Sequence, residues 1–371
     1  MYNIKPDYKP FIFLLDLLGN IIFFPLRFKK FPKDIKKILI IRLDHIGDMI
    51  LTTPVFKSVK SNYPKAKVHV LCREITKPII KNNPYIDRVI SFNPPWFARN
   101  DRSSTWINKI KKLRKEKYDL IIELKSDPRN ILIAFLIKGY KVGFASRGMG
   151  FLLNKQVKWD KKIKHIVLRN LDILKAIKVK KIFYKLELFN QSIKSKKIEN
   201  ILNKSNSEFI LGINPGVGAP EREWPIEKFA KLINLINNKF NAKIVLFDNN
   251  TVRTKKIMKN VVNKKVVLDL SGKLNLSELI EAIKKCDLFI GLESAAIHIA
   301  SAVGTPCIDI HSGVTYKKEW GPYQGKSIIL QNFVGHYASK KKKIWSMESI
   351  KESRVIAAIS KLSKDFNTNL I

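Results

Sequence analysis

The residues with the clearest chemical potential lie at positions 288–298, where the sequence reads Leu-Phe-Ile-Gly-Leu-Glu-Ser-Ala-Ala-Ile-His. The apolar run predicts a buried strand, and the acid, the hydroxyl and two small residues then open a helix. The N-terminus of a helix presents free backbone N–H groups and a positive dipole end, which suits a diphosphate. The small Ala295 and Ala296 let a ligand approach that backbone. An ordinary strand–helix–strand unit with Glu293 and Ser294 as helix caps explains the pattern equally well.

Two carboxylates and a histidine, Asp44, His45 and Asp48, form a second group. They follow the apolar residues 37–43, which predict the first parallel strand. A threonine–proline pair at positions 53–54 then predicts a helix start, with the threonine as N-cap. Open α/β sheets bind ligands at the carboxyl ends of their strands, so the group is placed for a ligand site. The alternative is that these side chains cap the helix that follows.

The third group combines a glycine-rich loop with a basic residue. Residues 209–214 predict a buried strand that runs into Asn214-Pro-Gly216, and Arg222 precedes a predicted helix at 226–238. Such a loop offers backbone N–H groups, and an arginine beside it offers charge to an anionic ligand. The alternative for Arg222 is a solvated surface arginine.

These stretches, in this order and at this separation, resemble glycosyltransferase family 9, the ADP-heptose:lipopolysaccharide heptosyltransferases and their relatives. The resemblance runs from about residue 36 to about residue 330. Each motif alone is a weak signal, whereas the ordered set is specific for the family, though not for the sugar. The motifs are Arg42-Leu-Asp-His-Ile-Gly-Asp48, Thr53-Pro54, Asn214-Pro-Gly216, Arg222-Glu-Trp-Pro225, residues 271–278 and Gly291-Leu-Glu-Ser-Ala-Ala-Ile-His298.

The resemblance implies a GT-B architecture, in which two Rossmann-like, doubly wound α/β domains face a cleft. It also implies an inverting transfer from a nucleotide sugar, with Asp48 as the general base that takes the proton of the acceptor hydroxyl. The expected acceptor-binding residues are Asp44, His45 and Arg129. The expected donor-binding residues are Asn214, Gly216, Arg222, Glu293, Ser294, Ala295, Ala296 and His298.

The sequence departs from the family at the donor motif. The family usually has Asp-Ser/Thr-Gly where this chain has Glu293-Ser294-Ala295, so the carboxylate is a methylene longer and the third residue carries a Cβ. These changes shift the donor, weaken its binding or indicate a different nucleotide sugar. Because no paired carboxylates with metal spacing occur, and GT-B enzymes generally work without a bound metal, we expect no metal and no resident cofactor.

Charge limits the classes of partner. The 371 residues include 70 Lys and Arg against 31 Asp and Glu, a formal net charge of +39. Codon bias in an AT-rich genome explains part of the lysine content, but not the scarcity of acids. Such a surface favours nucleotide sugars, phosphorylated glycolipid, an anionic membrane surface or nucleic acid. Nucleic acid is not expected, because the basic residues are spread along the chain and no nucleic-acid-binding motif occurs.

Residues 11–24 form an almost wholly apolar segment that a proline ends. The segment is short for a bilayer span, Asp16 interrupts it and no cleavage site follows, so a signal peptide is not expected. On a helix, Lys9, Asp16 and Asn20 share one narrow stripe, and basic residues follow at positions 27–33. The pattern predicts an amphipathic helix in the interface of an anionic membrane. A helix packed on the protein's own core is the alternative.

Elsewhere, apolar strands alternate with helices, which predicts parallel, doubly wound sheets. Strands are expected at 37–43, 68–72, 88–92, 118–124 and 141–144, and an acceptor-side loop at 93–102. We expect a membrane-interface segment at 1–35, an acceptor-side domain at 36–190, a linker at 191–207, a donor-binding domain at 208–335, and a polar loop with a final helix at 336–371. The separate Cys72, Cys286 and Cys307 indicate buried thiols in a reducing compartment.

Three functions fit these observations. The first is transfer of a heptose or related sugar from ADP-heptose to a lipid-linked lipopolysaccharide core, by an enzyme peripheral to the inner face of the cytoplasmic membrane. The second is a GT-B glycosyltransferase with another nucleotide-sugar donor that builds other surface glycans. The third is a non-catalytic binding protein at the membrane, which the departures at Glu293 and Ala295 motivate. The sequence indicates neither the linkage nor an oligomeric state.

Overall fold

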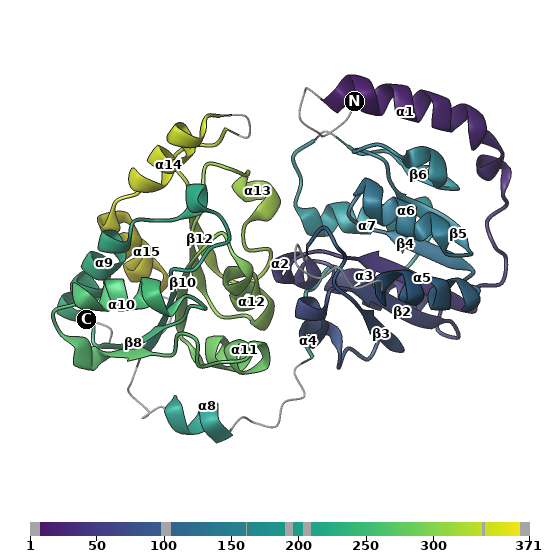
Figure 1. Cartoon of the computed structure of the whole chain (residues 1–371). Coiled ribbons are helices and arrows are strands. Elements are labelled where there is room, and N and C mark those ends of the chain that lie inside the picture. The colour runs from purple at the N-terminus through teal and green to yellow at the C-terminus, as the bar shows by residue number, and fades with distance from the viewer. Residues whose placement is uncertain are drawn as a thin grey trace. The chain divides into compact units, whose positions relative to one another are not determined.

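A computed structural model of the chain describes residues 8–97, 105–160, 162–189, 196–202, 209–335 and 338–363. Contacts between residues divide the chain into two compact units. Unit 1 comprises Met1–Lys162 and Val167–Lys185, and unit 2 comprises Ile163–Ile166 and Leu186–Ile371. Each unit is built on one parallel sheet of six strands, with helices packed against it (Figure 1).

The sheet of unit 1 has the strand order β3-β2-β1-β4-β5-β6. Its first strand is apolar without interruption, because both of its faces are covered: Ile38 and the three residues after it are fully buried. The order reverses at β1, which pairs with β2 on one side and β4 on the other. The strands are β1 (Lys37–Arg42), β2 (Lys67–Cys72), β3 (Arg88–Ser91), β4 (Leu120–Glu123), β5 (Tyr140–Phe144) and β6 (Lys155–Val157).

The sheet of unit 2 repeats this topology, in the order β12-β11-β10-β7-β8-β9. Its first strand, β7, pairs with β8 and β10, so the order again reverses at the first strand. Both sheets therefore have the Rossmann order, and the predicted GT-B fold class is confirmed. The strands are β7 (Phe209–Asn214), β8 (Ala242–Leu246), β9 (Val267–Asp269), β10 (Leu288–Leu292), β11 (Cys307–Ile310) and β12 (Ser327–Leu330).

The helices that matter for the site follow strand ends. In unit 1 they are α2 (Ile46–Ile50), α3 (Thr53–Asn62), α6 (Pro128–Leu136) and α7 (Ile166–Ala176, which begins in unit 2). In unit 2 they include η5 (Pro220–Arg222), α9 (Ile226–Lys239), α10 (Thr251–Lys259), α12 (Ala295–Val303), α14 (Lys340–Glu348) and α15 (Glu352–Ser363). Within the expected linker, the described residues form the short helix α8 (Lys196–Ile201).

Two local expectations are wrong. Thr53 is the first residue of α3 and not its N-cap, because its hydroxyl donates to the Ile50 carbonyl and Thr52 occupies the cap position. The lysines from position 340 onward are helical and not part of a polar loop. Ser339 caps α14 there by accepting the Lys342 N–H.

The N-terminal helix α1 (Lys9–Ile22) belongs to unit 1 (Figure 1). It contacts that unit through its polar stripe and through Leu15, which packs on the cluster of Ile131, Phe151, Leu152 and Leu153. Asp16 Oδ1 accepts the Met149 N–H at 2.7 Å. Gly19 is buried against the Phe151 ring, so close that an added Cβ would lie 2.5 Å from it. The polar residues thus face the protein.

The other side of α1 exposes apolar side chains. Seven of them keep between 49% and 68% of their surface exposed: Phe11, Phe13, Leu14, Leu17, Leu18, Ile21 and Ile22. The turn that follows, η2 (Phe24–Phe28), exposes two more phenylalanines. Among the described helices, none combines the length and apolarity needed to cross a membrane. The surface formed by these side chains is called the apolar face of α1 below.

Candidate active site

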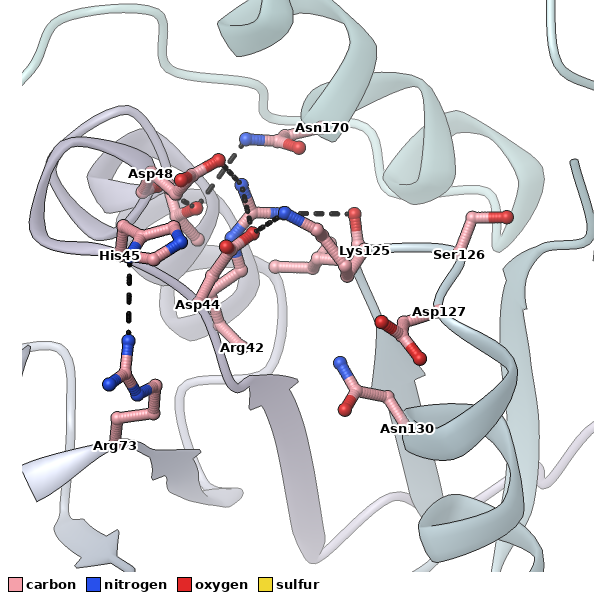
Figure 2. Close-up of polar contacts among 12 residues, drawn as sticks. Arg42, Asp44, His45, Asp48, Arg73, Lys125, Ser126, Asp127, Asn130 and Asn170 are labelled. Atoms are coloured by element: carbon pink, nitrogen blue, oxygen red, sulfur yellow. Dashed lines mark hydrogen bonds and ion pairs between the residues drawn. The ribbon is translucent and has the colours of Figure 1, made fainter. Parts of the chain in front are cut away.

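The carboxylates at the end of β1 meet a buried arginine. Asp44 follows the strand, and Asp48 comes from the first turn of α2 (Figure 2). The Arg42 guanidinium donates to Asp48 Oδ1 at 2.9 Å and lies 3.6 Å from Asp44 Oδ2. Its other amino group donates to the Leu124 carbonyl at 3.0 Å. Because only 1% of the Arg42 side chain is exposed, one buried cation holds both carboxylates in place.

A lysine from the neighbouring strand adds a second positive charge. Lys125 follows β4, which pairs with β1, and its ammonium group donates to Asp44 Oδ2. Sequence reasoning assigned no role to Arg42 or Lys125. A signal for Lys125 existed, since the carboxyl ends of adjacent parallel strands lie at the same edge of the sheet.

The two carboxyl groups differ in pKa. Burial and the negative charge of Asp48 raise the pKa of Asp44. Burial also acts to raise the pKa of Asp48, but the positive charges of Lys125 and Arg42 outweigh it and lower that pKa. The lowered pKa keeps Asp48 ionised at neutral pH. It also keeps 12% of its side chain exposed, against 1% for Asp44.

His45 is exposed and lies near Asp48 and Arg73 (Figure 2). Its Nδ1 is 3.5 Å from an Arg73 amino group, and its ring meets Phe97 edge-on with 5.6 Å between ring centroids. The Arg73 guanidinium stacks over the Phe97 ring at 4.0 Å. Phe97 belongs to the expected acceptor-side loop, whose residues 98–102 lie outside the described part of the chain. These groups suit a ligand that carries negative charge.

Arg129 lies in the first turn of α6 and is held by Asp127, the N-cap of that helix. Its Nε and Nη2 atoms donate to the two carboxylate oxygens of Asp127 at 2.9 and 2.6 Å. The guanidinium also lies 5.0 Å from the centre of the Trp96 ring, with half of its side chain exposed. The structure thus places Arg129 beyond the carboxyl end of β4, where Asp127 already partly neutralises its charge.

A buried glutamate shapes the turn that carries these residues. Glu123 accepts the backbone N–H groups of Lys125 at 2.9 Å and Ser126 at 2.7 Å. Ser126 has a φ of 60°, in the left-handed region that side chains other than glycine rarely adopt. Burial raises the pKa of Glu123 to about 7, although both backbone donors oppose that rise.

In unit 2 the predicted donor residues Arg222 and Glu293 form an ion pair. Arg222 Nη1 lies 3.0 Å from Glu293 Oε1, with 32% and 5% of the side chains exposed. The Ser312 and Thr315 hydroxyls donate to the two Glu293 oxygens at 2.5 and 2.8 Å. Glu293 is therefore a buried carboxylate held by three side chains and not a helix cap.

Near the N-terminus of α12, two buried hydrogen-bond donors have no partner among the described residues. Ser294 occupies the N-cap position, but among the described residues its hydroxyl bonds no helix N–H. Its Oγ atom and Arg222 Nε are both buried without a hydrogen-bond partner in the described structure. The first N–H groups of a helix also lack intrahelical partners, so those of Ala295 and Ala296 have no partner within α12.

His298 lies one turn into α12 and is 5% exposed. Burial lowers its pKa to about 3, so the imidazole is neutral. Its Nδ1 is another buried atom without a partner among the described residues.

The loop after β7 is fixed by a side chain and by close packing. Asn214 Nδ2 donates to the Phe247 carbonyl at 3.0 Å. A Cβ at Gly216 would lie 2.6 Å from Asp248 Oδ1, so glycine is required there. Asp248 in turn accepts from Arg253 at 2.8 Å.

Comparison with known proteins decides the family. A sequence profile of glycosyltransferase family 9 (heptosyltransferase) matches residues 106–350, about two thirds of the chain. The chain belongs to glycosyltransferase family 9. It is 28% identical over 346 residues to lipopolysaccharide heptosyltransferase 3 of Escherichia coli, covering 85% of this chain and 96% of that protein. It is 24% identical over 322 residues to lipooligosaccharide heptosyltransferase 2 of Haemophilus influenzae, covering 82% and 91%.

Solved structures show the same fold. A family 9 glycosyltransferase of Veillonella parvula matches with a TM-score of 0.75 and 22% identity, covering 90% of this chain and 98% of that one. The ADP-heptose lps heptosyltransferase II of E. coli matches with a TM-score of 0.71 and 19% identity, covering 89% and 99%. These structures show the fold, and membership of family 9 makes the chain a glycosyltransferase.

The departure at Glu293 has a structural account in this family 9 glycosyltransferase. The Glu293 side chain is one methylene longer than that of aspartate, and its carboxylate accepts hydrogen bonds from the Ser312 and Thr315 hydroxyls. Across the described ranges, no group of three or more His, Cys, Asp or Glu is arranged to hold a metal ion.

Proposed function

We propose that this glycosyltransferase moves a heptose, or a closely related sugar, from ADP-heptose to a lipopolysaccharide core acceptor with inversion. The names of its relatives support this, since several are lipopolysaccharide heptosyltransferases that match over most of both chains. A solved structure of similar fold is a heptosyltransferase of E. coli with ADP. The donor and acceptor classes of the chain are proposed on this basis.

The observation that carries the proposal is the asymmetric carboxylate pair at the end of β1. Asp48 is ionised, partly exposed and fixed by Arg42, whereas Asp44 is buried behind it. In the proposed reaction, Asp48 takes the proton of the acceptor hydroxyl as that oxygen forms a bond to the anomeric carbon. The bond from this carbon to the diphosphate breaks on the opposite side, which inverts the configuration.

The departing ADP needs charge stabilisation, which we assign to unit 2. Arg222, the Ser294 hydroxyl and the N–H groups of Ala295 and Ala296 are the donors for the diphosphate. Asn214 and Gly216 shape the neighbouring loop, and His298 packs behind the helix N-terminus as a neutral side chain. Lys228, a further basic residue of α9, instead donates to the Ile350 carbonyl at 2.9 Å. No metal is assigned to the reaction.

The test is the Asp48→Asn variant, assayed with ADP-heptose and a core acceptor that lacks the heptose. Loss of a general base lowers kcat by about 10²- to 10⁴-fold, while ADP affinity stays within about twofold because Asp48 lies outside the donor-binding residues. Asp172→Asn is the matched control, since it neutralises a carboxylate of α7 that pairs with the surface Lys175. Unchanged turnover of folded Asp48→Asn enzyme would refute the assignment.

Two outcomes favour the other functions that the sequence leaves open. Turnover with a different nucleotide sugar and none with ADP-heptose keeps the chemistry and changes the donor. No turnover and no binding of any nucleotide sugar by folded wild-type protein identifies a non-catalytic member of the family.

We also propose that the protein is peripheral to the cytoplasmic face of the inner membrane. The specific support is the apolar face of α1, which points away from unit 1, and the basic residues at positions 27–33 that follow it. An amphipathic helix with neighbouring basic residues binds the interface of anionic bilayers. A lipid-linked acceptor lies at that surface.

A further inference from the structure

A buried ionic cluster lies behind the Arg222–Glu293 pair, and no step of the proposed chemistry uses it. Asp309 is in β11 and His311 follows the strand, so both side chains point to the same face of the sheet. Asp309 and His311 are both fully buried. Buried charges persist only when they are paired and hydrogen-bonded, so the partners of this histidine define its charge.

The distances place His311 between two carboxylates. Its Nδ1 lies 2.7 Å from Asp309 Oδ2. Its Nε2 lies 3.1 Å from Thr315 Oγ1 and 3.6 Å from Glu293 Oε2. The titratable and charged groups around the ring are Asp309, Glu293, Arg222 and His298.

The hydrogen-bond partners of His311 indicate which of its ring nitrogens carry protons. The Thr315 hydroxyl has a single proton, and it donates that proton to Glu293 Oε1 at 2.8 Å. Towards His311 the same oxygen can therefore only accept, so Nε2 carries a hydrogen. Burial raises the pKa of Asp309, but the charge and hydrogen bond of His311 oppose that rise. With Asp309 ionised, its carboxylate accepts, so Nδ1 carries a hydrogen as well. An imidazole with hydrogens on both nitrogens is a cation.

With His311 charged, the formal charges of the four side chains in the cluster sum to zero. Glu293 and Asp309 contribute two negative charges, and His311 and Arg222 contribute two positive ones. Burial lowers the pKa of His311, but Asp309 and Glu293 outweigh it and raise the pKa, which agrees with the accounting. Of the four side chains, Arg222 is the most exposed, with 32% of its surface accessible. It is therefore the member that can move.

We propose that His311 is a positioning residue whose fixed positive charge lets Arg222 leave Glu293 and bind the donor diphosphate. The inference rests on the proposed donor site. While His311 is charged, Glu293 stays paired with a cation after Arg222 moves. If His311 were neutral, that movement would leave two buried carboxylates without a compensating charge, so Arg222 would remain on Glu293.

The first test needs no ligand. Nitrogen NMR of histidine-labelled wild-type protein, with His311→Gln to assign the signal, is expected to show two N–H groups on His311 at about pH 7.5. A His311 ring with one bare nitrogen would overturn the proposal, whatever the enzyme binds.

The second test measures ADP affinity by calorimetry. His311→Gln is expected to raise Kd about tenfold or more, because a neutral side chain strengthens the hold of Glu293 on Arg222. The double variant Glu293→Gln/His311→Gln removes one charge of each sign and is expected to recover affinity to within about threefold of wild type. A purely structural histidine would show no such recovery.

His69→Gln is the matched control, since His69 is also buried but lies in unit 1 and bonds Tyr118. Unchanged ADP affinity in His311→Gln, with wild-type binding intact, overturns the inference and leaves the proposed function standing. Failure of the wild-type protein to bind ADP counts against the proposed donor itself.

Discussion

Arg42 shows how one residue sets the properties of its neighbours. An arginine stays charged even when buried, so it holds Asp44 and Asp48 together without losing its proton. Lys125 contributes a second charge that can reach solvent. The result is a pair of carboxyl groups with opposite pKa shifts, of which Asp48 is the more exposed.

A pH profile follows from these shifts. A general base must be deprotonated, so activity falls only as pH drops through the pKa of Asp48, which lies below the ordinary value of about 3.9. We expect kcat/KM to stay level from about pH 7 to about pH 5. Lys125→Met removes the cation that lowers this pKa most, so the acidic limb is expected to move to higher pH.

Lys175→Met is the matched control for that profile, because Lys175 is exposed and pairs with Asp172 in α7. Intrinsic fluorescence measured across the same pH range separates titration from unfolding. An acidic limb that does not move in Lys125→Met would show that another group controls it.

The candidate residues were predicted unevenly from sequence. Asp44 and Asp48 were found because they follow an apolar strand directly. Lys125 was missed because its role depends on which strand pairs with β1, and that pairing is a tertiary contact. His311 was missed for the same reason, since an aspartate and a histidine two positions apart look ordinary until Glu293 is placed beside them.

At the scale of elements, α1 reverses the usual arrangement of an amphipathic helix on a soluble domain. Asp16 and Asn20 face inward, where Asp16 accepts a backbone N–H and the Asn20 side chain donates to the Asp16 carbonyl. Leu15 packs on the hydrophobic cluster of unit 1, but seven other apolar residues of α1 are exposed, against the general rule that a helix buries its apolar stripe. A contiguous apolar surface of this kind marks an interaction site.

Replacing Leu14, Leu17 and Ile21 together by glutamine tests the apolar face. Burial of such side chains contributes about 1.5–3 kcal/mol each, so binding to vesicles that contain anionic phosphatidylglycerol is expected to fall by about a hundredfold or more. The melting temperature is expected to change little, because all three side chains are about half exposed or more. Sedimentation with vesicles gives the first quantity and a thermal melt the second.

The control is the same substitution at Val252 and Val262, which are exposed on unit 2 and lie far from α1 in sequence. These variants are expected to bind vesicles as the wild type does. Vesicle binding that survives in the α1 variant would assign attachment to another part of the surface.

The strands that sequence predicts best are those buried on both faces, since they form unbroken apolar runs. β6 was not predicted, because Lys155-Gln-Val157 lies at a sheet edge and carries no apolar run. α2 was not predicted, because its five residues are too few to show a helical period. The stripe on α1 was predicted, but sequence periodicity does not say which face of a helix meets the protein.

At the scale of the molecule, both units use one topology for two tasks. Each sheet reverses its strand order at its first strand, and the groups assigned to chemistry follow strand ends near that point. In unit 1 these groups are carboxylates and cations, which we propose act on the acceptor. In unit 2 they are a helix N-terminus and an arginine, which we propose bind the diphosphate.

The donor nucleotide can be tested on the intact protein by thermal stabilisation. A ligand that binds only the folded state stabilises it by about 2.7 kcal/mol at a hundredfold excess over Kd. We expect ADP to raise the melting temperature, and GDP, UDP and CMP at the same concentration to have little effect. Stabilisation by another nucleotide alone would replace ADP in the proposed reaction.

The attachment of α1 also has a kinetic consequence. Because Asp16 bonds Met149 and Asn154 donates to the Leu26 carbonyl, the helix cannot swivel freely on unit 1. An enzyme held on a bilayer through such a helix has a set tilt, so each acceptor arrives by lateral diffusion in two dimensions. Turnover on membranes should then depend on the number of acceptors per unit area of lipid, and only weakly on their concentration in the bulk volume.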